Sequence, residues 1–322
     1  MTMKVYRWRQ SDLGFKLGTG VFALMLVAIV SGIGVELYRQ SLLSIHKFGL
    51  GFWSTDTWDP VAGDFGARPF IWGTLYSSVL ALLIATPISL GIAVYLSELC
   101  PSWLRQPLSF LTELLAAIPS IVYGLWGVFV LVPFVRGLEA ATPDALRALP
   151  LFSGPPIGVG MLSAALILAV MVTPFTSSIA REVLKAVPLS QREGAYALGA
   201  TRWEAIKAAL FYARVGIVGA VMLGFGRALG ETMAVTMVIG NNPRVAWSLY
   251  APQHTMAAVV ANEFTEASGD LYLSALVEIG LVLFIITLIV NGLSRLLIWS
   301  MDRSSAVRLK SSKRVPLGEG AA

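Results

Sequence analysis

Six long apolar segments constrain the fold of this chain more than any other feature. Each has the length of a bilayer-spanning helix, which needs about 20 mostly apolar residues. Only 13% of the 322 residues are charged and 56% are hydrophobic, whereas about 25% charged is usual in soluble domains. The predicted spans are Leu17–Tyr38, Trp72–Leu96, Leu108–Val135, Ile157–Ala180, Val215–Gly240 and Leu273–Trp299. The sequence therefore predicts an all-α integral membrane protein with six transmembrane helices.

The distribution of Lys and Arg predicts how these spans are oriented. Sixteen of the 24 basic residues fall in the N-terminal arm (1–16), the loop after the second span, the long loop after the fourth span and the C-terminal tail (300–322), and six fall on the opposite side. Loops rich in Lys and Arg usually face the cytoplasm. We therefore expect both termini in the cytoplasm, a transmembrane domain at 17–299 and a poorly ordered tail. The net charge of +5 follows the membrane, so it does not indicate a nucleic-acid partner.

The long loop, at about 181–213, has the pattern of two short helices separated by a sharp break. Ser190–Glu193 and Thr201–Glu204 each fit a capping box. Gly199 lies between them, where a helix end often needs a left-handed residue. The first helix presents small residues that allow close approach: Gly194, Ala195 and Ala197. From this pattern alone the loop is either a solvated connector or an element that docks into a cytoplasmic partner.

Two opposite charges interrupt the fifth predicted span, in the stretch GFGRALGETMAV (224–235). Burying Arg227 and Glu231 in a bilayer costs at least ~2.5–3.5 kcal/mol each on insertion scales. They are four residues apart, so we expect them to share one helix face, about 6 Å apart along the axis. Small residues recur every four positions around them: Gly216, Ala220 and Gly224, and Gly226, Gly230 and Ala234. Because such spacing allows close helix packing, the pair is expected to face protein or a pathway rather than lipid.

These two regions resemble one transporter family. Glu193-Gly194-Ala195 followed by Gly199 resembles the EAA loop of ABC importer permeases, although Gly194 stands where Ala is usual. Leu210–Tyr212 replaces the proline that commonly closes this motif, which predicts a less kinked entry into the fifth span. The stretch around Arg227 is similar to the phosphate-specific branch, and within it to PstC-type rather than PstA-type permeases. The similarity is strong over residues 174–299 and weaker over the first three spans.

The resemblance implies a MetI-like fold in the bacterial inner membrane and a role in importing inorganic phosphate. It implies three kinds of partner: a homologous PstA-type permease, a cytoplasmic PstB-type ATPase dimer that binds ATP, and an extracytoplasmic PstS-type phosphate-binding protein. The residues that it assigns to the substrate pathway are Arg227, Glu231 and Thr232. Those that it assigns to the ATPase coupling loop are Glu193, Gly194, Ala195 and Gly199. Gly226 and Gly230 are expected at a helix–helix contact, with the homologous permease as the partner.

The ion pair admits several interpretations. Arg227 suits a phosphate oxyanion because its guanidinium presents a fork of donors and keeps its charge. Glu231 would hold Arg227 in place without substrate, or accept the proton that hydrogen phosphate carries and sulfate lacks. The competing interpretation is a static salt bridge that fixes helix packing. Two further carboxylates are less informative. Glu278 has no evident partner in the sixth span. Glu113 is near the edge of a span and is expected at the membrane–water interface.

The sequence also lacks the motifs of several enzyme classes. It contains no G-x-x-x-x-G-K-[ST] phosphate loop, so any energy from ATP is expected to come through a partner. It contains no G-x-S-x-G nucleophile elbow either. A single Cys and two His, both in predicted external loops, disfavour a metal centre. We therefore expect a non-enzyme without a cofactor or a metal of its own.

Three other functions remain possible at this stage. A self-contained anion channel or secondary transporter could use the same Arg–Glu pair, although no internal inverted repeat is evident. An ABC permease for another oxyanion would need the same arginine. A structural or sensory protein could dock a signalling partner through the loop, but it would not need intramembrane charges. The external loop 241–272 adds one structural expectation, a short interfacial helix at 255–264.

Overall fold

The computed structural model describes residues 10–312, with side chains described from 14 to 301. The described part is almost entirely helical, and its one sheet is an antiparallel pair of short strands, β1 (Trp58–Asp59) and β2 (Asp64–Phe65). The helices before the centre of the chain are α1 (Gln10–Phe48), α2 (Gly51–Ser54), α3 (Arg68–Val94), the π-helix η1 (Tyr95–Leu99), α4 (Ser102–Ala117), α5 (Ser120–Trp126), the π-helix η2 (Gly127–Leu131), α6 (Val132–Ala140), α7 (Asp144–Arg147) and the 3₁₀-helix η3 (Pro150–Phe152). The later helices are α8 (Met161–Lys185), α9 (Leu189–Ala197), α10 (Arg202–Leu229), α11 (Met233–Ile239), α12 (Met256–Glu263) and α13 (Asp270–Ser312).

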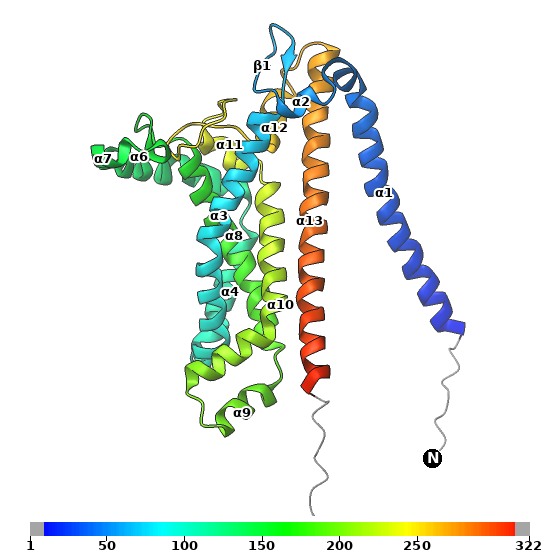
Figure 1. Ribbon diagram of the computed structural model, residues 1–322, viewed down its shortest axis with the longest axis vertical. Coiled ribbons are helices and arrows are strands. Elements are labelled where there is room, and N and C mark those ends of the chain that lie inside the picture. Colours follow the sequence, from blue (N-terminus) through cyan, green and yellow to red (C-terminus); the bar gives the residue numbers. More distant parts are fainter. Residues whose placement is uncertain (1–9, 313–322) are drawn as a thin grey trace, which may run out of the picture.

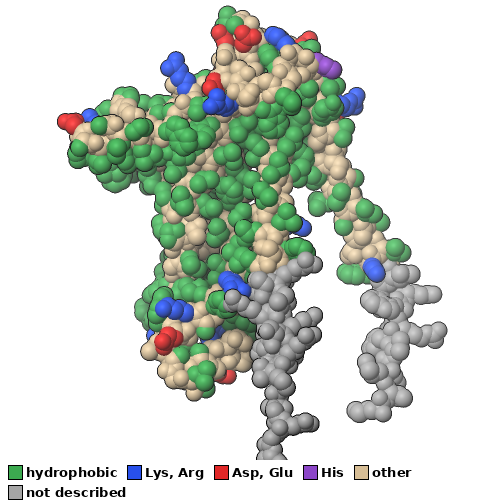
Figure 2. Space-filling model, viewed as in Figure 1, with side chains coloured by type: hydrophobic (Ala, Val, Ile, Leu, Met, Phe, Trp, Pro, Cys, Tyr) green, Lys and Arg blue, Asp and Glu red, His purple; other side chains and the backbone are tan. Residues whose placement is uncertain are grey.

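Six helical segments of the described residues are long and apolar enough to cross a membrane, which confirms the predicted number. They are Gly14–Phe48, Arg68–Leu99, Ser120–Ala140, Met161–Lys185, Arg202–Leu229 and Asp270–Met301. On the face shown in Figure 2, hydrophobic side chains cover the middle of the molecule, and charged side chains gather towards its two ends. This separation is what a bilayer-spanning protein requires, because lipid cannot solvate charge.

The spans form a packed centre with two helices at one side. Helix α8 packs against both α3 and α10, and α1 packs against α13 (Figure 1). Helix α9 lies at the lower end in this view, the end where α1 starts and α13 finishes. The β-hairpin and α12 lie at the opposite end. Helix α12 is the short helix that was expected in the last external loop.

The predicted third span, Leu108–Val135, is wrong at its start. Helix α4 ends at Ala117, and a separate helical run begins at Ser120. Ile118 between them is extended, with ψ of 131°. The next residue, Pro119, disfavours a helical conformation of the residue before it, which is consistent with the break at Ile118.

The predicted fifth span, Val215–Gly240, is wrong at both of its limits. Helix α10 begins at Arg202 and ends at Leu229, and the short helix α11 follows after a break. The second helix of the long loop is therefore the first part of α10 and not a separate element. The helix continues through Leu210–Tyr212, as the missing proline predicted.

Local signals decided where the loop helices begin. At Thr201 the predicted capping box is present: Glu204 N donates to Thr201 Oγ1 at 3.4 Å, and Thr201 N donates to Glu204 Oε2 at 2.7 Å. The second predicted box, at Ser190, is wrong, because α9 begins at Leu189 with Pro188 at its N-cap, so Ser190 already lies inside the helix. Pro188 has a non-helical ψ of 139° and provides no side-chain cap.

The predicted terminal segments fall partly outside the described residues. Helix α1 begins at Gln10, within the predicted arm, and α13 continues to Ser312, within the tail that was expected to be poorly ordered. The remainder of the arm (1–9) and of the tail (313–322) lies outside the described residues.

Candidate functional site

The three predicted pathway residues, Arg227, Glu231 and Thr232, lie at or beside a break between α10 and α11; Figure 1 shows where these two helices meet. Helix α10 ends at Leu229, Gly230 follows with φ of −95° and ψ of 1°, and α11 starts at Met233. Arg227 is therefore in the last turn of α10, while Glu231 and Thr232 lie in the break. Glycine weakens a helix interior because it has no side chain and more backbone freedom to lose, so a break at Gly230 is physically reasonable.

Arg227 and Glu231 do not form the predicted ion pair. Among the described side chains, no carboxylate oxygen lies within 4.0 Å of the Arg227 guanidinium. Glu231 instead accepts a hydrogen bond at its Oε1 from Ala234 N, at 3.4 Å, in the first turn of α11. The prediction assumed a continuous helix, and the break at Gly230 removes the shared face. In this conformation the static salt bridge is therefore absent.

The Arg227 guanidinium packs on an aromatic ring instead. Its central carbon lies 5.2 Å from the centre of the Phe175 ring on α8. A ring face attracts a cation without using up the guanidinium N–H donors. Arg227 is half-buried, so it keeps its positive charge and donors close to a protein interior. An arginine in this state can bind an oxyanion with two parallel hydrogen bonds.

Thr232 contributes polar atoms to the same break. Its Oγ1 donates to Gly230 O at 3.4 Å, and its carbonyl accepts a hydrogen bond from Thr236 Oγ1 at 2.8 Å. Glu231 and Thr232 are both half-buried. The break therefore brings together one cation, one carboxylate and one hydroxyl on irregular backbone, an arrangement that membrane proteins tolerate only where it is buried in protein or lines a cavity.

The two rows of small residues on α10 have different surroundings. A Cβ on Gly216 would lie 2.6 Å from Val183 of α8, and a Cβ on Gly224 would collide with Thr176 of α8. This row packs within the chain. Gly226 and Gly230 meet no comparable obstacle, because their nearest neighbouring atoms lie 3.8 Å and 3.9 Å from such a Cβ. Their predicted contact with another subunit stays a prediction.

Helix α9 presents the predicted coupling residues on an open surface. None of its residues is buried, and a Cβ on Gly194 would meet no atom within 4 Å. Glu193 is exposed and Ala195 is half-buried. Gly199 has φ of +81°, which confirms the predicted left-handed end of the helix.

An ion pair that the sequence analysis missed fixes α9 to the rest of the protein. Arg192 Nη2 and Nε donate to Glu98 Oε1 and Oε2 at 2.6 Å and 3.1 Å. Arg192 also donates to the carbonyls of Val187 and Leu184, and the carbonyl of Glu98 accepts from Arg202 Nη2. Glu98 lies in η1, 94 residues before Arg192, so sequence spacing gave no signal for the pair. It connects the loop helix to the end of the second span.

These features of the fold and the site indicate the class of membrane protein to which the chain belongs. A bundle of six candidate spans, a half-buried arginine at a helix break and an exposed, tethered loop helix are typical of an ABC-type membrane permease. The fold is also similar to the solved structure of the MetNI methionine ABC transporter in an inward-facing conformation, with a TM-score of 0.55 and 16% identity, over 72% of this chain and 94% of that chain. At this identity the likeness shows the fold alone.

Comparison of the sequence identifies the family. Residues 88–303 match the family described as "Binding-protein-dependent transport system inner membrane component". The phosphate transport system permease protein PstC of Haemophilus influenzae is 48% identical over 90% of this chain and 94% of its own length. The PstC protein of Mesorhizobium japonicum is 44% identical over 92% and 93%. The chain therefore belongs to the family of binding-protein-dependent transport system inner membrane components, and within it to the PstC group.

The resemblance in the sequence is thereby confirmed. The probable PstC protein of Methanocaldococcus jannaschii, an additional relative, is 39% identical over 90% of this chain and 94% of its own length. The alignments with these relatives cover 90–92% of the chain. The protein is a multi-pass membrane protein of a permease family rather than an enzyme family.

Proposed function

We propose that this chain is the membrane-spanning permease subunit of an ATP-driven importer that carries inorganic phosphate across the bacterial cytoplasmic membrane. The observation that carries the proposal is Arg227, a half-buried cation at a helix break that has no carboxylate partner among the described side chains. Its charge is costly inside a bilayer unless a ligand or a partner compensates it. The names of the relatives indicate that phosphate is this ligand.

Glu231 and Thr232 have secondary roles in this proposal. A carboxylate in the pathway can accept the proton that hydrogen phosphate carries, and sulfate has no such proton to donate. Thr232 offers a hydroxyl to the same anion. Because Glu231 bonds to α11 and not to Arg227, it does not block the guanidinium. Permeation of another oxyanion remains the alternative, and competition by sulfate and arsenate tests it.

The loop helix supports a proposal about partners. The exposed residues of α9 and the left-handed Gly199 form a surface that an ATPase dimer of the PstB type can engage from the cytoplasm. ATP would bind to that dimer. Gly226 and Gly230 would pack against a homologous PstA-type permease, and a PstS-type protein would deliver phosphate at the opposite side. In this proposal α9 and both termini face the cytoplasm.

Phosphate uptake in a double variant tests the role of Arg227. Arg227→Gln with Glu231→Gln should reduce uptake by about a hundredfold or more, because no fixed cation remains in the pathway. The matched control is Arg39→Gln with Glu36→Gln, which removes an exposed ion pair of 3.8 Å and should leave uptake unchanged. Near-normal uptake in the first variant, at equal membrane levels, would contradict the substrate role of Arg227.

A further inference from the structure

A second cluster of cations lies between α4 and α8, at the end of the molecule where α9 is found. It lines a cavity of about 400 Å³. Arg181 and Lys185 come from the last turns of α8, and Arg105 comes from the first turn of α4. The pathway residues described above are not among the residues that line this cavity.

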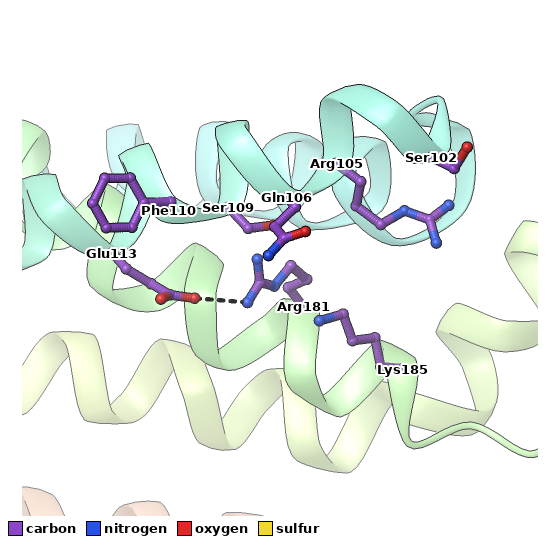
Figure 3. Close-up of a pocket in the computed structure, with 8 residues that line it drawn as sticks. All are labelled: Ser102, Arg105, Gln106, Ser109, Phe110, Glu113, Arg181 and Lys185. Carbon is purple, nitrogen blue, oxygen red and sulfur yellow. Dashed lines mark hydrogen bonds and ion pairs between the residues drawn. The ribbon is translucent and has the colours of Figure 1, made fainter.

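The spacing of polar residues explains why the cavity has polar walls. On α4, Gln106, Ser109 and Glu113 follow one another at intervals of three and four residues, so they share one face of the helix. On α8, Arg181 and Lys185 are four residues apart and also share a face. Figure 3 shows the two faces turned towards each other, with the Arg181 guanidinium close to Gln106 and Glu113.

Arg181 has more donors than the protein satisfies. The residue is only 5% exposed. Its Nη2 donates to Glu113 Oε1 at 2.9 Å and to Glu182 Oε1 at 2.8 Å. Its Nε and Nη1 are buried and have no hydrogen-bond partner within the described part of the chain. Buried donors in native proteins are nearly always paired, so these two nitrogens call for oxygen acceptors that the described residues do not supply.

Arg105 shows the same feature at the other side of the cavity. Its Nη2 donates to the carbonyl of Cys100 at 3.1 Å, while its Nε is buried and has no partner among the described residues. Lys185 Nζ pairs with Glu182 Oε1 at 3.0 Å on the edge of the cavity. Of the charged residues that line the cavity, three are cations and only Glu113 is an anion, and its side chain is 55% exposed to solvent.

We propose that this cavity binds a phosphate group, as a second anion site separate from Arg227. Arginine forks and an ammonium group are the donors that proteins use for phosphate oxygens. The group can belong to free inorganic phosphate or to the head of an anionic phospholipid, since the same three cations would bind either. The proposal does not depend on phosphate transport, because the residues of the two sites do not overlap.

Binding to the full-length chain in neutral detergent tests the site, with whatever subunits co-purify. The Arg227→Gln background keeps the pathway arginine from contributing to the signal. In this background, Arg105→Gln with Lys185→Gln should weaken the binding of radiolabelled inorganic phosphate by about tenfold or more. Both residues are partly exposed, so the fold should tolerate the change. The matched control is Lys207→Gln with Arg244→Gln, which removes the same charge from exposed positions and should leave binding unchanged.

A second measurement, of bound lipid, distinguishes the two sources of the phosphate group. If the source is a headgroup, native mass spectrometry should show phosphatidylglycerol retained by the parent and lost from the cavity variant, with phosphatidylcholine retained by neither. Arg181→Lys, which keeps the charge and removes the fork, should weaken binding of the same ligand. Equal binding of inorganic phosphate and of phosphatidylglycerol by the parent and the folded cavity variant would overturn the proposal.

Discussion

Arg192 and Arg227 occupy two regions with opposite electrostatic arrangements. Arg192, in the loop helix, binds both oxygens of Glu98 and donates to two backbone carbonyls. Arg227, at the helix break, packs on Phe175 and has no carboxylate within 4.0 Å among the described residues. The first arginine has used its donors to hold an element in position. The second makes no ion pair among the described residues.

The backbone around the two arginines also differs in what it allows. Helix α9 ends at a left-handed Gly199 and is joined to the bundle by short turns and the Glu98 ion pair. The break at Gly230 lies between two helices that pack on α8. The ion pair fixes α9 to the end of the second span. A packed break holds polar groups at fixed places within the membrane region.

The largest effect should come from Arg227→Lys. This variant keeps the positive charge but loses the planar fork, so it separates two-point recognition from simple attraction. We expect phosphate uptake to fall by about a hundredfold at an unchanged membrane level. Uptake within about twofold of the parent would show that charge alone is sufficient, and the contrast between the two arginines would lose its chemical basis.

The next effect concerns the pair that holds the loop helix. Glu98→Gln leaves Arg192 partly buried without its anion, and removing one partner of such a pair is strongly destabilising. Because α9 then loses its link to η1, we expect ATP-driven uptake to fall about tenfold while membrane insertion is retained.

A charge exchange provides the control for that experiment. Glu98→Arg combined with Arg192→Glu should restore part of the uptake if the ion pair is what positions α9. The exposed pair Glu36–Arg39 is the matched comparison, and Glu36→Gln should change stability by less than about 0.5 kcal/mol. If the charge exchange restores nothing and Glu98→Gln transports normally, the pair has no positioning role.

A smaller effect should distinguish the two faces of α10. Gly224→Ala places a methyl group against Thr176 and Val172 of α8 and should destabilise the chain by about 1–2 kcal/mol. Gly230→Ala meets no atom closer than 3.9 Å within the chain and should leave its unfolding midpoint unchanged. Thermal unfolding in detergent measures both variants. Equal destabilisation would show that the two faces do not differ in packing.

The smallest effect on stability should come from His254, which is buried in the loop just before α12. Burial lowers its pKa from 6.5 to about 4, and its Nδ1 accepts a hydrogen bond from Thr255 N. Between these two pKa values the unfolded chain binds more protons than the folded one, so stability falls as the pH drops from about 6.5 towards 4.

The expected size of this pH effect is below about 1 kcal/mol between pH 7 and pH 6. His254→Gln removes the titrating group and should flatten that part of the profile, as the unfolding midpoint at each pH will show. The selectivity for phosphate should not change, because His254 does not line the break. An unfolding midpoint that does not depend on His254 in this range would show that its imidazole is not held neutral by burial.

The sequence by itself determined the features that depend on local physics. Apolar runs predicted six spans, because a bilayer excludes unpaired polar groups whatever the tertiary arrangement. Thr201 and Glu204 predicted a helix start, and Gly199 predicted a left-handed helix end, because each depends on a few neighbouring residues. The motif around Arg227 also predicted the family correctly.

Tertiary structure decided which charges meet. Glu98 and Arg192 are 94 residues apart, and Glu113 and Arg181 are 68 apart, so neither ion pair had a signal in sequence spacing. Arg227 and Glu231 had the right spacing, yet the break at Gly230 separates them. Helix periodicity applies only within one continuous helix, and whether a helix continues through glycine depends on how its neighbours pack.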